Sequence, residues 1–396
     1  MNPLSHLLAL PEKEKSDRGL VHTPAEIAQQ PETWQSTFDL FVERRSEISA
    51  FLRSAGLQQD VNLRPTVFLL GAGTSDYIGR SLTQLLRRLW QCEVLAVPST
   101  DLLTNLNDWL LPGRRYLWIS FSRSGESAEG VAVLQQALQA RPDIHHLVVC
   151  CNAQGRMLRE TASRKQVLGV ALPDAVHDRG LAMTSSFSNM VVFGQCLANI
   201  GNLTPFRGIL NRLVEVGKSF LEIAAESAAK LAASPFRKVC FVGSGPLKAV
   251  AKESALKVLE LTSGKTTTMS ESALGLRHGP MAALDEETLF VCFLSGEQRV
   301  QNYEIMLLEE IGRKRLVKTR VVVHQNPNLD FHTWAEQALV LDTRDPLLDD
   351  YRVPLDVIFG QLLGLFFSIR WKLKPDAPSP SGAISRVVQN VLTLSD

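Results

Sequence analysis

The stretch Tyr116–Ser127, YLWISFSRSGES, decides the fold class of this chain. It begins as a continuous apolar run of β-forming residues, which is typical of a buried strand, and turns within four residues into hydroxyls, a glycine and an acid. The helical pattern Ala128–Leu138 follows directly. The first amides of a helix lack intrahelical partners and lie at the positive end of its dipole, so a Ser-rich turn here can bind an oxyanion. The alternative is an ordinary helix cap, because serine is preferred there in any helix.

Strand and helix patterns alternate on both sides of this stretch. Apolar runs at residues 67–70, 94–97, 147–151 and 167–172 predict further strands, and glycine-containing turns and helical patterns separate them. This alternation predicts an α/β fold with a doubly wound, flavodoxin-like parallel sheet that helices cover on both faces.

The pattern then repeats once. Gly71-Ala72-Gly73 recurs as Gly243-Ser244-Gly245, an offset of 172 residues (243 minus 71), and Ser124-Gly125-Glu126 recurs as Ser295-Gly296-Glu297 at an offset of 171 (295 minus 124). Landmarks at nearly one offset indicate a tandem duplication of one domain. The expected domains are an N-terminal helical arm (1–45), a first domain (46–215), a second domain (216–372) and a tail that closes the site (373–396).

The two copies are unequal. At the offset of 171, Ser122, Arg123 and Ser127 correspond to Phe293, Leu294 and Gln298, so the second copy lacks most of the hydroxyls of the turn. We therefore expect only the first turn to bind phosphate. The second copy instead has a long segment, Leu261–Leu284, between its first helix and its next predicted strand, where new chemistry can be placed.

The composition excludes several classes of function. The 42 Lys plus Arg against 41 Asp plus Glu give no field that points to nucleic acid or to an acidic membrane. No apolar run reaches the ~18 residues of a membrane span, and the amino end makes a poor signal peptide, so a cytoplasmic location is expected. The six cysteines, mostly in apolar runs, are expected to be reduced core residues, and neither they nor the histidines show metal-ligand spacing. The glycine turns miss the dinucleotide and P-loop fingerprints, so no cofactor is predicted.

Three polar clusters follow the glycine turns. Glu253, Lys257 and Glu260 have the spacing i, i+4, i+7 and so share one helix face, either as a solvated ion-pair stripe or as a carboxylate base with a lysine beside it. His278 lies in a glycine-bounded loop and is either polar surface or a proton-transfer group. The third cluster, His177-Asp178-Arg179-Gly180, precedes a helix start at Thr184. It is either a polar group of the site or simply a loop that an Asp–Arg pair shapes. In the arm, Thr23-Pro24-Ala25-Glu26 predicts a capped helix start.

Together these motifs resemble the sugar isomerase (SIS) domain family. The resemblance rests on residues 71–75, 122–127, 253–260 and 277–280, covers the chain from about residue 45 onward, and in tandem is similar to the isomerase half of glucosamine-6-phosphate synthase. Residues 97–102, 177–186 and 382–391 resemble more closely the AgaS-type proteins of N-acetylgalactosamine catabolism, known as galactosamine-6-phosphate deaminase/isomerase or tagatose-6-phosphate ketose/aldose isomerase.

The resemblance implies roles for particular residues. Glu260 matches the base that moves a proton between C1 and C2, Lys257 the lysine one turn earlier, and His278 the ring-opening histidine that the family supplies across a homodimer interface. The segment between Glu260 and His278 is longer than in the synthase, and the tail lacks the synthase's catalytic lysine. The residues implied to hold the phosphate are Ser75, Ser122, Arg123, Ser124 and Ser127, and further candidates for contacting the substrate are Gly73, Thr74, Arg179, Thr184, Ser381 and Arg386.

The expected activity is deamination of galactosamine 6-phosphate to tagatose 6-phosphate and ammonia, without metal or redox cofactor. Simple aldose–ketose isomerisation of an unaminated hexose 6-phosphate is the second enzyme hypothesis. A regulator that senses sugar phosphates is the hypothesis from another class, and the arm of about 45 residues, which lacks a basic patch and the length of a helix-turn-helix domain, speaks against it.

Overall fold

The computed structural model describes residues 2–388, so residues 389–396 of the predicted tail lie outside it. The described chain groups into two compact units. The first-sheet unit comprises residues 33–177, 185–206 and 386–388, and the second-sheet unit comprises residues 2–32, 178–184 and 207–385. The segment 178–184 therefore belongs by its contacts to the second-sheet unit, although it lies within the first repeat in sequence. The domain boundaries expected at residues 45, 215 and 372 stay a prediction.

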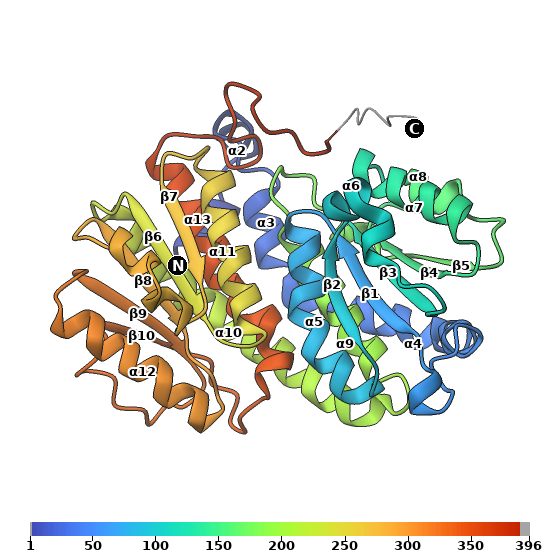
Figure 1. Ribbon diagram of the computed structural model, residues 1–396. Coiled ribbons are helices and arrows are strands. Elements are labelled where there is room, and N and C mark those ends of the chain that lie inside the picture. The colour runs from blue at the N-terminus through green and yellow to red at the C-terminus, as the bar shows by residue number, and fades with distance from the viewer. Residues whose placement is uncertain (1, 389–396) are drawn as a thin grey trace. The chain divides into compact units, whose positions relative to one another are not determined.

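The first-sheet unit is built on a five-stranded parallel sheet with the order β2-β1-β3-β4-β5 (Figure 1). The stretch that decided the fold class is its central strand, β3, and all seven of its residues are buried. The strands are β1 Thr66–Gly71, β2 Val94–Pro98, β3 Tyr116–Ser122, β4 His145–Cys150 and β5 Val167–Ala171. The helices are α4 Gln30–Ser54, α5 Thr74–Trp90, α6 Ser99–Trp109, α7 Ala128–Ala140, α8 Arg156–Arg159 and α9 Ser185–Ala198.

The second-sheet unit repeats this topology. Its order β10-β9-β8-β6-β7 is the first order written from the other edge, with β6 in the place of β1 and β8 in the place of β3. The predicted α/β class and the tandem duplication are confirmed. The strands are β6 Lys238–Gly243, β7 Thr267–Glu271, β8 Thr288–Phe293, β9 Thr319–His324 and β10 Gln337–Val340. The helices are α1 Pro3–Leu8, α2 Glu12–Arg18, α3 Thr23–Ala28, α10 Leu203–Ala233, α11 Leu247–Leu261, α12 Gln298–Arg313 and α13 Asp349–Arg370.

Several elements differ from the sequence predictions. The segment Leu261–Leu284 is not one long connection, because it contains the edge strand β7, whose polar and partly exposed residues lack the apolar run by which a buried strand is predicted. The second edge strand, β10, was also not predicted; it has only four residues and is half-buried. In the arm, Thr23 is not the cap of α3: the helix begins at Thr23 and its N-cap is His22. All six cysteines are free thiols, as expected.

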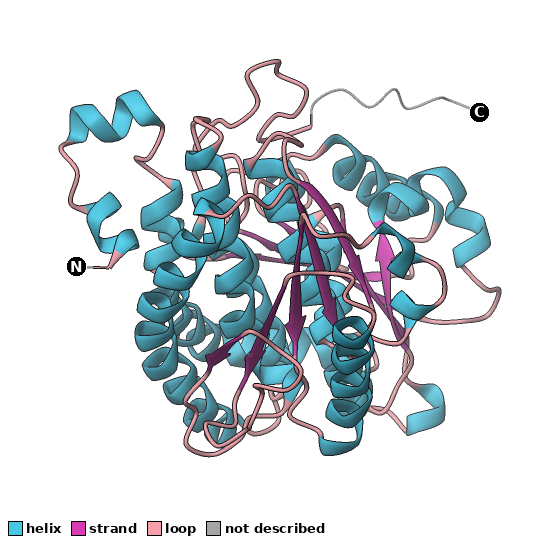
Figure 2. Ribbon diagram, turned by 90° about the vertical axis from the view of Figure 1, so that its left-hand side faces the viewer, coloured by secondary structure: helices cyan, strands magenta, loops and turns pink. Residues whose placement is uncertain are grey.

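Helices lie on both sides of the strands (Figure 2). In the first-sheet unit, α5 packs on one face, where a Cβ on Gly79 would lie 2.9 Å from the Cβ of Leu69. The other face forms an aromatic core under α6 and α7, with Phe68 stacked on Trp118 at 6.0 Å between ring centroids. Burial of such side chains contributes about 1.5–3 kcal/mol each and fixes the strands that carry the turns.

Helix α13 is the core helix of the second-sheet unit. By length and composition it is apolar enough to cross a membrane, but 94% of its most apolar window is buried inside the protein. Two glycines let its backbone approach α11: a Cβ on Gly360 would lie 2.1 Å from the Oγ of Ser254, and a Cβ on Gly364 would lie 3.0 Å from the carbonyl oxygen of Lys257. The position of α11 therefore depends on its packing against α13. No local sequence pattern predicts this dependence.

Candidate active site

Two turns that contain glycine and serine leave neighbouring strands of the first sheet. β1 pairs with β3 in parallel, with Leu70 opposite Ser120, so the turn after β1 and the turn after β3 start at the same edge. The strand order reverses between these two strands, and doubly wound sheets bind their ligands at such a point. The Thr74–Ser75 and Ser122–Ser127 turns therefore follow neighbouring strands at one edge of the sheet.

The turn after β1 requires its glycines. A Cβ on Gly71 would lie 2.3 Å from the backbone carbon of Ser75, so glycine is needed for α5 to start directly above the strand. Gly73 has φ +56°, a conformation that side chains rarely adopt. Thr74 and Ser75 follow as the first residues of α5, and both are buried. Their backbone amides lie at the positive end of the helix dipole.

The turn after β3 is folded by its own serines. The Oγ of Ser122 accepts a hydrogen bond from the amide of Gly125 at 2.9 Å, and the Oγ of Ser124 accepts one from the amide of Glu126 at 3.1 Å. Each hydroxyl retains its own proton, which it can donate to an anion. Ser127 is the N-cap of α7 and makes no side-chain cap bond. Glu126 turns toward α8, where its Oε1 accepts from the amide of Arg156 at 2.9 Å.

Arg123 and the last described residues also meet at this turn. The Arg123 side chain is 6% exposed, and its guanidinium donates to the carbonyl of Arg386. The amide of Ala128, the first residue of α7, donates to the carbonyl of Val388 at 3.4 Å. The main chain of residues 386–388 thus accepts from donors that would also suit an anion. Arg386, a predicted substrate contact, reaches the turn through its backbone.

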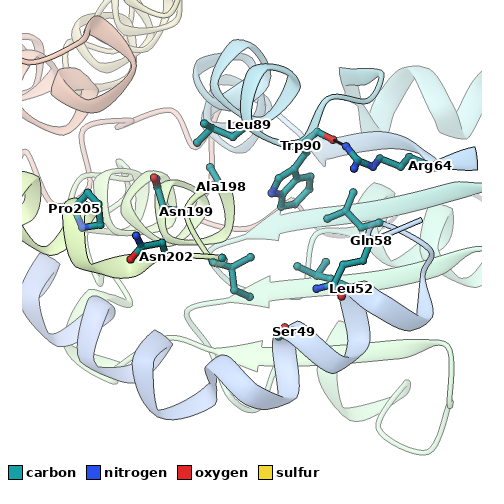
Figure 3. A pocket seen from close by; sticks show the side chains of 13 residues that line it. Ser49, Leu52, Gln58, Arg64, Leu89, Trp90, Ala198, Asn199, Asn202 and Pro205 are labelled. Carbon is teal, nitrogen blue, oxygen red and sulfur yellow. Dashed lines mark hydrogen bonds between the residues drawn. The ribbon is translucent and has the colours of Figure 1, made fainter. Parts of the chain in front are cut away.

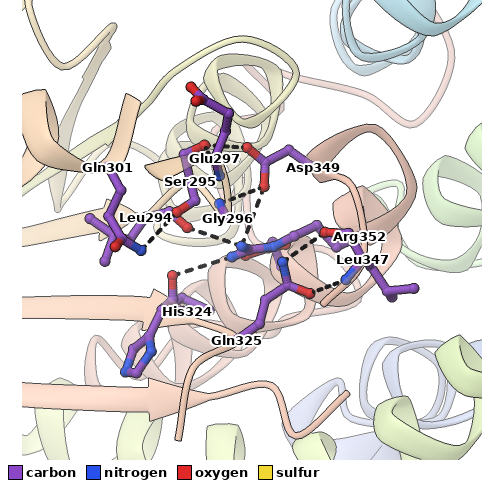
Figure 4. A network of polar contacts seen from close by, with 12 residues as sticks. Leu294, Ser295, Gly296, Glu297, Gln301, His324, Gln325, Leu347, Asp349 and Arg352 are labelled. Atoms are coloured by element: carbon purple, nitrogen blue, oxygen red, sulfur yellow. Dashed lines mark hydrogen bonds and ion pairs between the residues drawn. The ribbon is translucent and has the colours of Figure 1, made fainter. Parts of the chain in front are cut away.

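The equivalent turn of the second-sheet unit has the same local fold but different partners (Figure 4). The Oγ of Ser295 accepts from the amide of Glu297 at 3.1 Å, which repeats the contact of Ser124 with Glu126. Here, however, the Oγ of Ser295 also donates to Asp349 at 2.5 Å, and the amide of Gly296 donates to the same carboxylate at 2.9 Å.

Two more carboxylates complete this second turn. Glu297 caps α12 by accepting from the amides of Arg299 and Val300 at 3.1 and 3.0 Å. Glu304 accepts from the amide of Ser295 at 2.7 Å, and burial raises its pKa to about 7. The donors that bind an anion in such a turn are therefore taken by the protein's own acids. This agrees with the expectation that only the first turn is suited to phosphate.

A buried ionic cluster lies on α11. Lys257 is fully buried, and its Nζ lies 2.6 Å from the Oε2 of Glu260 and 3.4 Å from the Oε1 of Glu253. The Glu253 side chain is also fully buried, whereas that of Glu260 is 24% exposed. The three residues share one helix face as predicted, but the alternative of a solvated ion-pair stripe is wrong. Glu260 is thus the carboxylate of this cluster that solvent reaches, and its role as a general base stays a prediction.

His278 lies apart from α11 in sequence, on the exposed loop between β7 and β8. The loop is fastened on one side by Arg277, which donates to Glu310 of α12 at 2.9 Å. On the other side Gly279 has φ +118°, and a Cβ there would meet nothing within 4 Å. The imidazole is thus presented on the surface of the second-sheet unit.

The remaining predicted substrate contacts lie in two segments of the second-sheet unit. Arg179 is exposed, and Thr184 is buried with its amide donating to Asp178 at 2.7 Å. Asp178 therefore shapes the loop through its hydrogen bond with Thr184. Ser381 lies on the exposed tail.

A cavity lies at the far end of the first-sheet helices (Figure 3). It measures about 620 Å³ and is lined by Leu89 and Trp90 at the end of α5 and by Ala198 at the end of α9. Since α5 has 17 residues, this end lies about 25 Å from Thr74. The cavity contains none of the predicted site residues, so the polar turns and not this cavity are the candidate site. Among residues 2–388, no group of three or more His, Cys, Asp or Glu side chains is placed to hold a metal.

Two carboxylates for which the sequence predicts no functional role accept hydrogen bonds from loops and so hold them in place. Asp349 closes the second turn, and Glu26, interpreted only as an acid in the first turn of a helix, binds the backbone of the loop that carries Arg179. Their partners lie 54 and 154 positions away in sequence, so no local pattern signals them.

Known proteins resemble this chain over nearly its whole length. No family model matches it. It is 37% identical over 377 residues to an AgaS protein of Streptomyces coelicolor, across 95% of this chain and 96% of that protein. It is 34% identical to the D-galactosamine-6-phosphate deaminase AgaS of Escherichia coli, across 93% of this chain and 94% of that protein. The solved tagatose-6-phosphate ketose/aldose isomerase of Escherichia coli matches with a TM-score of 0.81 and 31% identity, across 90% of this chain and 94% of that one.

The solved relative shares the fold, and the sequence similarity extends over at least nine-tenths of this chain in all three. An identity of 34–37% over more than nine-tenths of both chains is far above what a common fold alone produces. The chain belongs to the AgaS family.

Proposed function

We propose that this protein is an amino sugar phosphate deaminase that couples aldose–ketose isomerisation to the release of ammonia. Its substrate is galactosamine 6-phosphate, and with one water it yields tagatose 6-phosphate and ammonia. The observation that carries the proposal is the buried Lys257, 2.6 Å from the partly exposed Glu260, in a chain whose relatives of this family are named D-galactosamine-6-phosphate deaminase.

The 6-phosphate binds at the turn after β3. Ser122, Ser124 and Ser127 supply hydroxyl donors, Arg123 supplies a cation, and Ser75 adds the start of α5 from the neighbouring strand. Charge-assisted hydrogen bonds of this kind are about twice as strong as neutral ones. The phosphate is remote from the reacting carbons, so its binding energy serves to position the open-chain sugar.

Glu260 carries the proton transfer. In the open-chain form, C1 is an aldehyde and C2 bears the amine and one proton. Glu260 removes the C2 proton while O1 takes a proton from water, which gives an enamine-enol. Glu260 then returns its proton to C1 and the nitrogen gives one proton back to the hydroxide, which leaves C1 as an alcohol and C2 as an imine. Water adds to this imine, and ammonia leaves as the C2 ketone forms. Lys257 holds Glu260 in position through their ion pair at 2.6 Å.

His278 opens the sugar ring before this step by moving a proton on the ring oxygen and the C1 hydroxyl. Its exposed loop is suited to serve the active site of a second copy, so the functional enzyme is a homodimer with shared sites. The tail closes the site: residues 386–388, which accept from Arg123 and Ala128, exchange these contacts for the substrate's phosphate.

The experiment that tests the function is an ammonia-release assay on purified protein. Wild type is expected to release ammonia from galactosamine 6-phosphate, and Glu260→Gln to lower kcat by several orders of magnitude with an unchanged circular dichroism spectrum. Glu309→Gln, an exposed carboxylate on α12, is the matched control and is expected to leave kcat unchanged. Near-normal turnover by Glu260→Gln would overturn the assignment of the base.

A second candidate is the isomerisation of an unaminated hexose 6-phosphate. It is favoured by the similarity to the tagatose-6-phosphate ketose/aldose isomerase of Escherichia coli, and it uses the same proton transfer between C1 and C2. The two functions separate in one assay: an enzyme that converts tagatose 6-phosphate to its aldose but releases no ammonia from galactosamine 6-phosphate or glucosamine 6-phosphate is an isomerase only.

A further inference from the structure

Three segments that are remote in sequence meet around the carboxyl group of Glu26 in the second-sheet unit. They are the start of α3, the loop 178–184 and the chain that follows α13 at Asp376. The Glu26 residue is only 7% exposed. A buried acid at the junction of three segments requires specific partners, because an unpartnered carboxylate is costly away from water.

The partners of Glu26 are backbone amides of the loop. Its Oε1 accepts from the amide of Arg179 and from that of Gly180 at 3.2 Å. The contact is tight, since a Cβ on Gly180 would lie 3.0 Å from the Oε2 of Glu26 and 2.8 Å from the Oγ1 of Thr23. Glu26 thus fixes the backbone from which the exposed Arg179 side chain projects.

A second carboxylate anchors the start of the helix that carries Glu26. Asp376 accepts from the amides of Val21 and Thr23 at 2.8 and 2.7 Å and from the Oγ1 of Thr23 at 2.8 Å, so it anchors the first residue of α3. Its own carbonyl accepts from the amide of Leu181 at 3.0 Å, which ties the same loop to the chain after α13.

The other end of the loop is tied to the helix that supports α11. Gln361 of α13 donates to the carbonyl of Thr184 at 3.2 Å and accepts from the side chain of Gln30 at 2.7 Å. Its neighbour Gly360 is the residue whose backbone approaches Ser254 of α11. The loop that carries Arg179 and the helix that carries Glu260 are therefore held by one continuous set of contacts.

We propose that Glu26 is a positioning residue for the reaction, which fixes the backbone of the loop 178–184 and so holds the Arg179 side chain ready to contact the substrate. This inference rests on the proposed function. Glu26 acts through the loop backbone and does not itself contact the substrate. The local sequence Thr23-Pro24-Ala25-Glu26 predicts only an ordinary helix start. It does not signal the contact of Glu26 with the loop.

The charge state of Glu26 gives this role a pH dependence. The charged groups that act on it are Asp178 of the loop and Asp376 of the chain after α13. Burial, followed by the nearby charge of Asp178, raises the pKa of Glu26 from 4.5 to about 8. The acid is therefore neutral at pH 7. Its contribution is fully present below pH 4.5 and is lost as the pH rises through about 8, when a third negative charge joins Asp178 and Asp376.

The test compares the pH profiles of kcat/KM for ammonia release by three proteins. Wild type is expected to lose activity with a midpoint at about 8. Glu26→Gln, which resembles the neutral acid in shape and charge, is expected to keep activity within about twofold at pH 7 and to lack this midpoint. Glu26→Ala removes the acceptor of two amides and is expected to lower kcat/KM about 10- to 100-fold at every pH, mainly through KM.

Two controls separate positioning from simple stability. Glu14→Gln removes an exposed acid of the arm that pairs with Arg18, and it is expected to leave the profile unchanged. Arg179→Ala and Glu26→Ala are expected to be non-additive in the double variant, because both remove the same contact. Additive losses, or a Glu26→Gln profile that keeps the wild-type midpoint, would overturn the proposal.

A substrate-free measurement distinguishes this inference from the proposed function. Hydrogen exchange of the 178–184 peptide, corrected for the intrinsic effect of pH, is expected to speed up above about pH 8 in wild type but not in Glu26→Gln. If exchange shows this difference but wild type releases no ammonia, the proposed function is wrong. Glu26 then only holds the loop in place and has no role in catalysis. If ammonia is released and exchange is the same in both proteins, the role of Glu26 is wrong and the proposed function stands.

Discussion

Replacing Lys257 by methionine tests the buried cluster of α11 directly. The substitution keeps most of the side-chain volume and removes only the cation, whose Nζ lies 3.4 Å from Glu253 and 2.6 Å from Glu260. Glu253 is fully buried and loses the cation that faces it. Glu260 is 24% exposed and can be solvated in part.

The two carboxylates make unequal contributions to the expected loss. A partly exposed ion pair contributes about 0–1 kcal/mol, so the pair with Glu260 is the smaller part. Removing one partner of a buried pair costs about 3–5 kcal/mol, because the other charge stays buried without compensation. We therefore expect Lys257→Met to lower the free energy of unfolding by about 3–5 kcal/mol, and the melting temperature of the second-sheet unit by roughly 6–20 °C.

The assay is thermal and urea unfolding followed by circular dichroism, combined with ammonia release. The double variant Glu253→Gln/Lys257→Met removes both buried charges and is expected to regain most of the stability. It is not expected to regain activity, because Glu260 still lacks its lysine. A Lys257→Met protein within about 1 kcal/mol of wild type would refute the reasoning on burial, and a fully active double variant would refute the role of the lysine.

Two further predictions concern the phosphate turn and the helix pair. Arg123→Ala is expected to raise KM for galactosamine 6-phosphate about 10- to 100-fold, as for a lost hydrogen bond to a charged group, and to leave kcat/KM for unphosphorylated galactosamine unchanged; equal losses on both sugars would contradict a phosphate contact. Gly360→Ala would bring a Cβ to 2.1 Å from the Oγ of Ser254 and is expected to cost about 1–3 kcal/mol in thermal unfolding and to reduce kcat. Gly208→Ala, in α10 with nothing within 4 Å of the added Cβ, is the matched control and is expected to gain about 0.5–1 kcal/mol, so similar shifts in both variants would contradict the helix contact.

The sequence was sufficient where the signal is local. The buried run Tyr116–Ser122 could form only an interior strand, and its repeat around Ser295 predicted a second sheet of the same topology. The shared face of Glu253, Lys257 and Glu260 follows from the 3.6-residue period of a helix. The edge strand β7 was missed because a half-exposed strand needs no apolar run, and β10 because it has only four residues. Helix α13 was missed because its burial comes from packing on α11.

The sequence by itself thus determined the fold, its duplication and which residue types stand at the end of each strand. Only the tertiary structure decided the environment of those residues: that Lys257 is fully buried, that Asp349 fills the second turn, and that Glu26 binds the loop of Arg179. The physical reason is that backbone periodicity fixes the direction of a side chain within its own element. Burial and partner choice depend instead on segments far away in sequence, which only packing brings together.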